Sequence, residues 1–220
     1  KRSIEDHFDL NYELEHQIAG TGKEKYLESI QRVMDIASFS FTRQREMKGL
    51  GHAILTGRRL VGDQAFGVIL SDDLCMPPEA GVGVMAQMVK LYKQFRCSIV
   101  AIQEVDGADI EKFGVVEGEK LKEGIFRVSN MVEKPKLADA PSNLAVIGRY
   151  ILTPDIFDIL EKTPPGKGGE IQLTDALMQQ AQEGAVLAYR FKGTRYDCGS
   201  VEGFIEATNY VYENIYRQSK

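Results

Sequence analysis

Short apolar runs mark the predicted strands of this chain. The four runs are residues 66–70, 98–102, 144–152 and 185–191. The first two are continuous, a pattern typical of strands that are covered on both faces of a sheet. Between them, residues 83–95 place apolar side chains at helical spacing, which predicts a helix. This alternation of strand and helix predicts βαβ units and therefore a sheet that is mainly parallel.

The segment between the second and third runs has a different pattern. Residues 113–116 and 125–132 are strand-like, and a charged stretch that ends in Gly124 separates them. Two strands joined so closely along the chain predict an antiparallel hairpin. Nearer the N-terminus, Ser and Phe alternate at residues 38–42, which predicts another short strand.

Helical spacing of apolar residues recurs along the rest of the chain. The predicted helices are residues 3–34, divided at Gly20 and Gly22, and residues 49–60, 154–162, 171–182 and 201–216. We interpret the aromatic end of the last helix as core or as a contact between subunits. No repeat and no low-complexity linker interrupts the pattern, so we predict one α/β domain over residues 1–220 with a small antiparallel insert.

The composition narrows the classes of function. The chain has 27 Lys and Arg against 32 Asp and Glu, a net charge of −5, which disfavours nucleic-acid binding through bulk positive charge. No apolar run approaches the roughly 18 residues of a membrane span, and the first residues lack the apolar core of a signal peptide. The three cysteines, Cys75, Cys97 and Cys198, form no CxxC pair and indicate a reducing compartment. We therefore expect a cytoplasmic protein that partners neither nucleic acid nor membrane.

Two aspartates lie at the ends of predicted elements. Asp72 comes directly after the run at 66–70, and Asp197 follows a strand-like segment that ends at Arg195 and Tyr196 and precedes the helix at 201–216. Carboxylates at strand ends can hold Mg²⁺ together with phosphate oxygens and water. Each residue also has a plainer interpretation, Asp72 as a turn cap and Asp197 as a helix N-cap. Taken singly the plainer interpretations are favoured, whereas one shared cation would support both metal assignments together.

Other residues have side chains that suit a phosphorylated ligand. Lys134 ends a predicted strand before Pro135, which favours an extended conformation from which its ammonium could meet a phosphate. The alternative, a solvated strand end, is favoured for Lys134 alone. Gln44 precedes Gly49 and Gly51 at the start of a predicted helix, where glycines permit close backbone approach and an amide could read a base edge. This spacing is neither the dinucleotide fingerprint nor a P-loop.

Seven motifs occur in one order along the chain. They are QxxxxGLGHA at 44–53, LSDD at 70–73, FGVV at 113–116, VEKPK at 132–136, GRY at 148–150, GEIQLTDA at 169–176 and YDCG at 196–199. In this order they resemble the bacterial UTP–glucose-1-phosphate uridylyltransferases, a family of sugar-nucleotide pyrophosphorylases, over nearly the whole chain. The segments at 141–150 and 169–175 are closer to that family than to its thymidylyl or adenylyl relatives.

The resemblance implies a fold and a reaction. The fold is α/β, with a Rossmann-like mixed sheet flanked by helices. The reaction is the Mg²⁺-dependent exchange of UTP and glucose 1-phosphate for UDP-glucose and pyrophosphate, by in-line attack on the α-phosphorus. The alternatives are a related pyrophosphorylase with another nucleotide or sugar, and a non-catalytic regulatory homologue. The family also implies a homodimer or a homotetramer.

The resemblance further implies roles for individual residues. The implied uracil contacts are Gln44 and Gly49, the metal ligands Asp72 and Asp197, and the sugar contacts Gly114 and Glu133, with Glu170 near the sugar. The implied phosphate-binding residues are Lys134, for glucose 1-phosphate, and Lys192, and the catalytic residues are Lys134, Asp72 and Lys192.

One motif of the family is not found in this sequence. A glycine-rich Gly-x-Gly-Thr-Arg loop ending in lysine, with the first strand before it, would lie upstream of Ser3. That loop surrounds the triphosphate, and the strand belongs in the middle of the sheet. We therefore expect the chain to be a fragment of a longer protein, which as written binds UTP poorly and turns over little or nothing.

Overall fold

The computed structural model describes residues 2–79, 81–184 and 186–217. Contacts within the chain divide it into two compact units, one up to Arg45 and the other from Glu46 onwards. The single nucleotidyltransferase domain expected over residues 1–220 stays a prediction.

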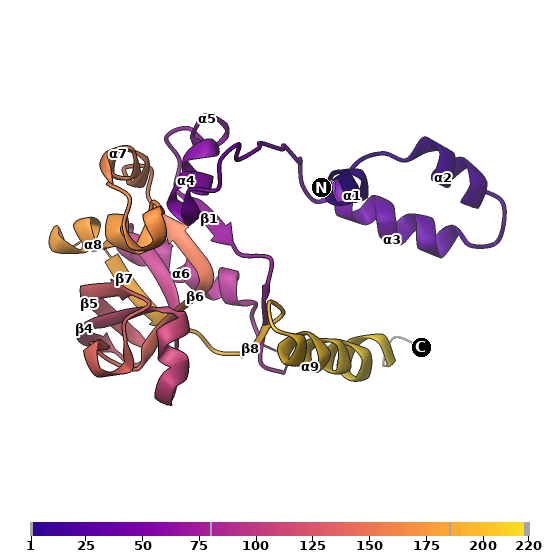
Figure 1. The fold of residues 1–220 in the computed structure, drawn as a ribbon. Helices are drawn as coiled ribbons and strands as arrows, with labels where there is room; N and C mark the ends of the chain where they lie inside the picture. The colour runs from indigo at the N-terminus through magenta and orange to yellow at the C-terminus, as the bar shows by residue number, and fades with distance from the viewer. Residues whose placement is uncertain (1, 80, 185, 218–220) are drawn as a thin grey trace. The chain divides into compact units, whose positions relative to one another are not determined.

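The first unit is helical. Its helices are α1 (Arg2–His7), α2 (Tyr12–Ile18) and α3 (Glu24–Asp35) (Figure 1). The predicted division at Gly20 and Gly22 is confirmed, and both residues have a positive φ that glycine adopts without a Cβ clash. The first predicted piece is not one helix, because residues 8–11 separate α1 from α2. The strand predicted at 38–42 is wrong, because these residues join no ladder in the described chain. Instead, the ring of Phe39 stacks on that of Phe8, with centroids 4.4 Å apart.

The second unit is built on a six-stranded sheet in the order β1-β6-β3-β7-β5-β4 (Figure 1). Its strands are β1 (Phe66–Ile69), β3 (Ser98–Glu104), β4 (Gly114–Lys122), β5 (Ile125–Glu133), β6 (Leu144–Leu152) and β7 (Val186–Arg190). The predicted hairpin is confirmed as β4 and β5, and it forms one edge of the main sheet. Ala185, the first residue of the predicted run at 185–191, lies outside the described residues. A second, two-stranded sheet pairs β2 (Asp73–Met76) with β8 (Thr194–Asp197) and was not predicted.

The mixed α/β class is confirmed, but the ladders are not mainly parallel as predicted. Strands β1, β3, β4 and β7 share one direction, and β5 and β6 run opposite to them. Because β6 lies between β1 and β3, and β5 between β7 and β4, the single parallel ladder among the described strands is β3–β7. The βαβ pattern therefore predicts the direction of β1 and β3, but not the later strand that separates them.

Helices cover both faces of this sheet. One face packs against α4 (Gly49–Thr56), α7 (Ile156–Lys162) and α8 (Leu173–Gln182), and the other against α6 (Val84–Phe95). Alternate residues of β3 point to opposite faces, as the pleat requires: Val100 and Ile102 reach the first core, and Ile99 and Ala101 the second.

Strand β1 departs from its predicted burial. Ile69 is 59% exposed, so the run at 66–70 is not covered on both faces. The physical reason is position, because β1 lies at the edge of the described sheet and pairs with β6 alone. The predicted helix at 49–60 also divides, since α4 ends at Thr56 with Gly57 as its C-cap and the short α5 (Arg58–Val61) follows.

The last helix is α9 (Val201–Val211), which a π-helical turn extends over Tyr212–Tyr216. Its small residues Gly203 and Ala207 are buried, whereas Phe204 and Tyr212 are more than half exposed. These larger side chains line an apolar groove that Leu74 of β2 closes. In the ranges that the structure describes, no helix is both long and apolar enough to cross a membrane.

Candidate functional site

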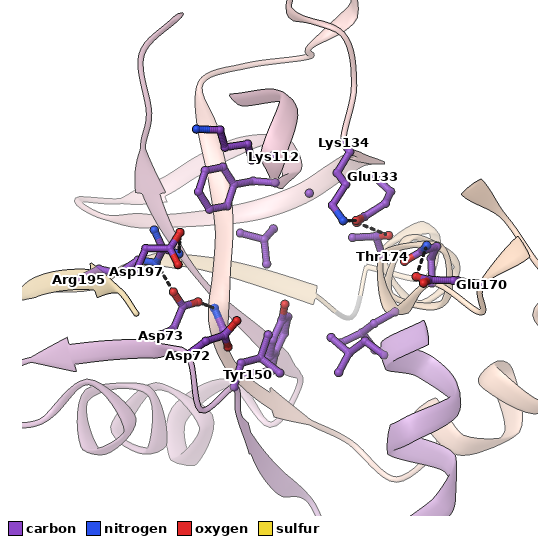
Figure 2. Close-up of a pocket in the computed structure, with 18 residues that line it drawn as sticks. Asp72, Asp73, Lys112, Glu133, Lys134, Tyr150, Glu170, Thr174, Arg195 and Asp197 are labelled. Carbon is purple, nitrogen blue, oxygen red and sulfur yellow. Dashed lines mark hydrogen bonds and ion pairs between the residues drawn. The ribbon is translucent and has the colours of Figure 1, made fainter. Parts of the chain in front are cut away.

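A cavity of about 330 Å³ opens over the middle of β6 (Figure 2). Its size is within the usual range of small-ligand sites. The floor comes from β6, and the walls come from the ends of β4, β5 and β8 and the first turns of α4 and α8. The polar lining has two parts, which lie on opposite sides in Figure 2. The aspartate end consists of Asp72, Asp73, Arg195 and Asp197, and the hairpin end of Gly114, Glu133, Lys134 and Thr174.

Strand β6 holds the turn that carries the first two aspartates. The backbone N–H of Gly148 donates to Asp73 Oδ2 at 2.6 Å. Arg149, itself buried, donates to the carbonyl oxygen of Leu70 at 3.1 Å and to that of Asp73. A Cβ at position 148 would lie 2.6 Å from Asp73 Oδ2, so this close approach requires glycine. The turn is therefore fixed to the sheet independently of any ligand.

Asp72 and Asp197 lie together in the cavity although they are far apart in the sequence. The β2–β8 ladder places Asp73 opposite Asp197, and the N–H of Cys198 donates to the carbonyl oxygen of Asp72 at 2.7 Å. A Cβ at Gly199 would lie 3.1 Å from Asp197 Oδ1 and 3.5 Å from Asp72 Oδ2. Both carboxylates thus border the same point, which stays open because residue 199 has no side chain.

The plainer interpretations of these two residues do not describe the structure. The N-cap of α9 is Ser200, whose hydroxyl accepts from the N–H of Gly203 at 3.1 Å, and not Asp197. Asp197 instead accepts from the N–H of Gly199 at 3.1 Å and pairs with Arg195 Nη2 at 3.1 Å. The carboxylate of Asp72 caps no turn in the described part of the chain.

The aspartate end suits a cation that arrives already bound to a phosphate-containing ligand. Within the described ranges, no three His, Cys, Asp or Glu side chains lie close enough to enclose a metal. Mg²⁺, however, takes one or two carboxylates and completes its shell with phosphate oxygens and water. The donor set of Asp72 and Asp197 matches that chemistry.

The hairpin end is built around the carboxylate of Glu133 at the end of β5. Glu133 Oε2 accepts from the hydroxyl of Thr174 at 3.1 Å, and Oε1 lies 3.7 Å from Lys134 Nζ. A Cβ at Gly114 would lie 2.8 Å from Thr174 Cγ2 and 3.2 Å from Glu133 Oε2. A side chain at position 114 would therefore occupy the space beside these two groups.

The extended conformation predicted for Lys134 from its place before proline is wrong. Its φ is 46°, in the left-handed region that residues other than glycine rarely adopt. Its N–H donates to the carbonyl oxygen of Phe113 at 3.0 Å, and its own carbonyl oxygen accepts from Lys167 Nζ at 2.6 Å. These two bonds hold the chain in the turn, and the side chain of Lys134, about half exposed, borders the cavity.

The remaining predicted residues have different positions. Glu170 lines the cavity, and Gly49 lies directly behind it, since a Cβ at position 49 would be 2.7 Å from Glu170 Cβ. Lys192 is not part of the cavity lining, and its N–H donates to Gln87 Oε1 at 3.0 Å. Gln44 belongs to the first unit, and its role toward uracil stays a prediction.

Tyr150, Thr174 and Arg195 line this cavity, although no role is predicted for them from the sequence. Tyr150 is buried and its hydroxyl points into the cavity (Figure 2). Burial, with the nearby carboxylates of Glu133 and Asp73, raises the pKa of this phenol well above its ordinary value. All three lie inside or beside the motifs that carry the family resemblance, which was the signal available for them.

Comparisons with known proteins show the family of the chain. The nucleotidyl transferase family model matches residues 12–214. A UTP–glucose-1-phosphate uridylyltransferase of Pseudomonas aeruginosa PAO1 is 67% identical over 220 residues, which are 100% of this chain and 78% of the relative. A uridylyltransferase of Staphylococcus saprophyticus is 43% identical over 208 residues, 94% of this chain and 71% of the relative.

Solved structures give the same result. The crystal structure of a UDP-glucose pyrophosphorylase complexed with UDP-glucose has a TM-score of 0.88 at 55% identity, over 97% of this chain and 77% of that one. An apo UDP-glucose pyrophosphorylase has a TM-score of 0.90 at 58% identity, over 97% of this chain and 78% of that one. The chain therefore belongs to the nucleotidyl transferase family, among its UTP–glucose-1-phosphate uridylyltransferases.

Proposed function

We propose that the protein transfers the uridylyl group of UTP to glucose 1-phosphate, giving UDP-glucose and pyrophosphate. The observation that carries the proposal is the cavity with two opposed ends, one with two carboxylates and the other with a lysine beside a carboxylate. The relatives named for this reaction are alike over nearly the whole chain.

Each end of the cavity suits one part of the reaction. At the hairpin end, Lys134 binds the phosphate of glucose 1-phosphate, while Glu133 and the backbone beside Gly114 bind the sugar. Glu170, on the same side of the cavity as Thr174 (Figure 2), lies near the same sugar. Thr174 fixes the rotamer of Glu133 through its hydrogen bond.

The reaction needs no general base, because glucose 1-phosphate is already ionised at neutral pH. Its oxygen attacks the α-phosphorus in line with the departing pyrophosphate. The barrier lies mainly in bringing two anions together and in the charge that develops on the phosphoryl oxygens. Positioning and electrostatics lower such a barrier without covalent catalysis.

Asp72 and Asp197 would hold Mg²⁺ at the aspartate end. When bound there with the nucleotide, Mg²⁺ supplies positive charge to the triphosphate. An oxygen of each carboxylate lies within about 3.5 Å of one point beside Gly199, and through this cation Asp72 would also act on the reaction. Uracil recognition by Gln44 and Gly49, and a phosphate contact from Lys192, remain parts of the proposal that rest on resemblance alone.

Initial rates with paired substrates test the proposed function. For the intact protein we expect kcat/KM with UTP and glucose 1-phosphate to exceed that with dTTP or galactose 1-phosphate by at least about tenfold, which corresponds to the net free energy of about one hydrogen bond. Chelation of divalent cations with EDTA should abolish turnover. Faster turnover with dTTP or galactose 1-phosphate would identify the protein as a related pyrophosphorylase. No turnover with any pair of substrates would indicate a regulatory homologue.

Two further predictions accompany this function. A homodimer or homotetramer is supported by the apolar groove along α9, whose Phe204 and Tyr212 are more than half exposed. A cytoplasmic location is supported by three cysteines that are free thiols in the described chain.

A further inference from the structure

Arg195 of β8 joins three separate parts of the cavity. Its side chain is 11% exposed, and its Nε–H donates to Asp73 Oδ1. Its Nη2 lies 3.1 Å from Asp197 Oδ2, and its guanidinium lies 5.1 Å from the ring centroid of Phe113. One buried cation therefore contacts two carboxylates of the aspartate end and the aromatic residue before Gly114 (Figure 2).

The contact with Asp73 anchors the guanidinium. Asp73 is 7% exposed, and its other carboxylate oxygen accepts from the N–H of Gly148 in the middle of β6. Through Asp73, the position of Arg195 is thus fixed to the main sheet, although β8 belongs to the small one. The contact with the ring of Phe113 restrains the guanidinium further.

The contact with Asp197 sets the orientation of a carboxylate that has few other restraints. The side chain of Asp197 is 42% exposed and receives one more hydrogen bond, from the N–H of Gly199 to Oδ1. With one donor on each oxygen, the carboxylate is held in a single orientation. Its remaining lone pairs border the point beside Gly199 that Asp72 Oδ2 also approaches.

We infer that Arg195 is a positioning residue, which holds Asp197 in the orientation that binds the divalent cation. The inference rests on the proposed function, which assigns Asp72 and Asp197 to the metal. The role requires the planar fork of arginine, because Nε and Nη2 must reach two different carboxylates at once. Lysine supplies the same charge as a single point and cannot span both.

Mn²⁺ binding tests the inference without measuring activity. The intact protein, saturated with UDP-glucose, is titrated with Mn²⁺ while the signal of free Mn²⁺ is followed by electron paramagnetic resonance. For Arg195→Met we expect the Kd of Mn²⁺ to rise about 10- to 100-fold, the usual effect of removing a residue that orients a metal ligand. Arg195→Lys should show most of this rise. The affinity for UDP-glucose without metal, measured by calorimetry, should change much less.

Arg190→Met is the matched control. Arg190, at the end of β7, forms an ion pair with Glu104 of β3 at 2.5 Å, and neither residue is part of the cavity lining. Its loss removes the same charge and should leave the Kd of Mn²⁺ unchanged. Because Arg195→Met removes a buried partner of Asp73, thermal unfolding of each variant is measured alongside, and Arg195→Lys keeps the test valid where the Met variant does not fold.

The outcomes separate two kinds of failure. Wild-type Mn²⁺ affinity in folded Arg195→Lys and Arg195→Met, with loss of binding in Asp197→Asn, would overturn the positioning role and leave the metal site intact. Wild-type affinity in Asp72→Asn and Asp197→Asn would instead overturn the metal assignment of the proposed function.

Discussion

The two ends of the cavity are constructed in opposite ways. At the aspartate end, Asp73 is 7% exposed, the side chain of Arg195 is 11% exposed, and each contacts two or more groups. At the hairpin end, Lys134 is about half exposed and its Nζ lies 3.7 Å from the nearest Glu133 oxygen, a loose pair. The first end is thus organised by the protein before any ligand binds, whereas the second leaves its cation available for an incoming anion.

The strands that support the two ends explain why one is rigidly paired and the other is loosely paired. The aspartate end depends on a two-stranded ribbon, which is marginal on its own and needs the contacts to β6 for a defined position. The hairpin end extends a ladder of the main sheet and inherits its rigidity from the strands. Lys134 can therefore stay loosely paired at the hairpin end, whereas Asp73 and Arg195 act as structural links at the aspartate end.

The largest expected effect is at the aspartate end. Asp72→Asn and Asp197→Asn each keep the shape of the side chain and remove one negative charge that the cation requires. We expect kcat to fall by at least about 100-fold in each, measured as the rate of pyrophosphate release at saturating Mg²⁺. Asp139→Asn, an exposed residue outside the cavity, is the control and should retain the wild-type rate. A wild-type rate in either cavity variant would remove that residue from the metal site.

The next effect distinguishes the two ends by substrate. Lys134→Ala removes a charge-assisted contact worth about 1.5–3 kcal/mol. We expect kcat/KM for glucose 1-phosphate to fall about 10- to 100-fold, while the Kd of UTP changes far less. Lys136→Ala, two residues further on and exposed, is the matched control. Equal losses for both substrates would contradict the assignment of Lys134 to the sugar phosphate.

The smallest effect concerns the floor between the two ends. Burial raises the pKa of the Tyr150 phenol above its unfolded value of about 10, so the folded state keeps a proton that the unfolded state loses. This contribution to the free energy of unfolding is present below about pH 10 and falls as the pH rises further, by at most about 1.4 kcal/mol per pH unit. Urea unfolding across this range should show the slope in the wild type relative to Tyr150→Phe, which has no phenol to titrate. If the free energies of unfolding of the two proteins changed with pH in parallel, the phenol would titrate normally.

The sequence predicted most elements of the fold because their patterns are local. The hairpin of β4 and β5, the strand β6 and the helices α6 and α8 follow from the period of their own apolar residues. The β2–β8 pairing has no such signal, because each strand is four residues long and finds its partner far along the chain. The exposure of Ile69 is likewise a property of its place at the sheet edge and not of its apolar run.

The site residues likewise divide into those that a motif predicts and those that depend on contacts made far along the chain. Asp72, Asp197, Glu133 and Lys134 were predicted from motifs, and the structure brings them to one cavity. Arg195 was not predicted, because a single arginine in a polar segment gives no indication that its partners lie on β2 and before β4. The left-handed φ of Lys134 was also missed, since the rule for residues before proline favours the extended region that tertiary hydrogen bonds override here.

That backbone conformation places stability and activity in conflict at one position. A left-handed φ costs a residue with a Cβ roughly 1–2 kcal/mol, and glycine alone avoids this cost. A library selected only for heat resistance would therefore enrich glycine at position 134, together with the loss of the ammonium that we propose binds the sugar phosphate. Lysine would be retained only where growth depends on the product. The residue found at position 134 therefore shows whether stability or activity was selected.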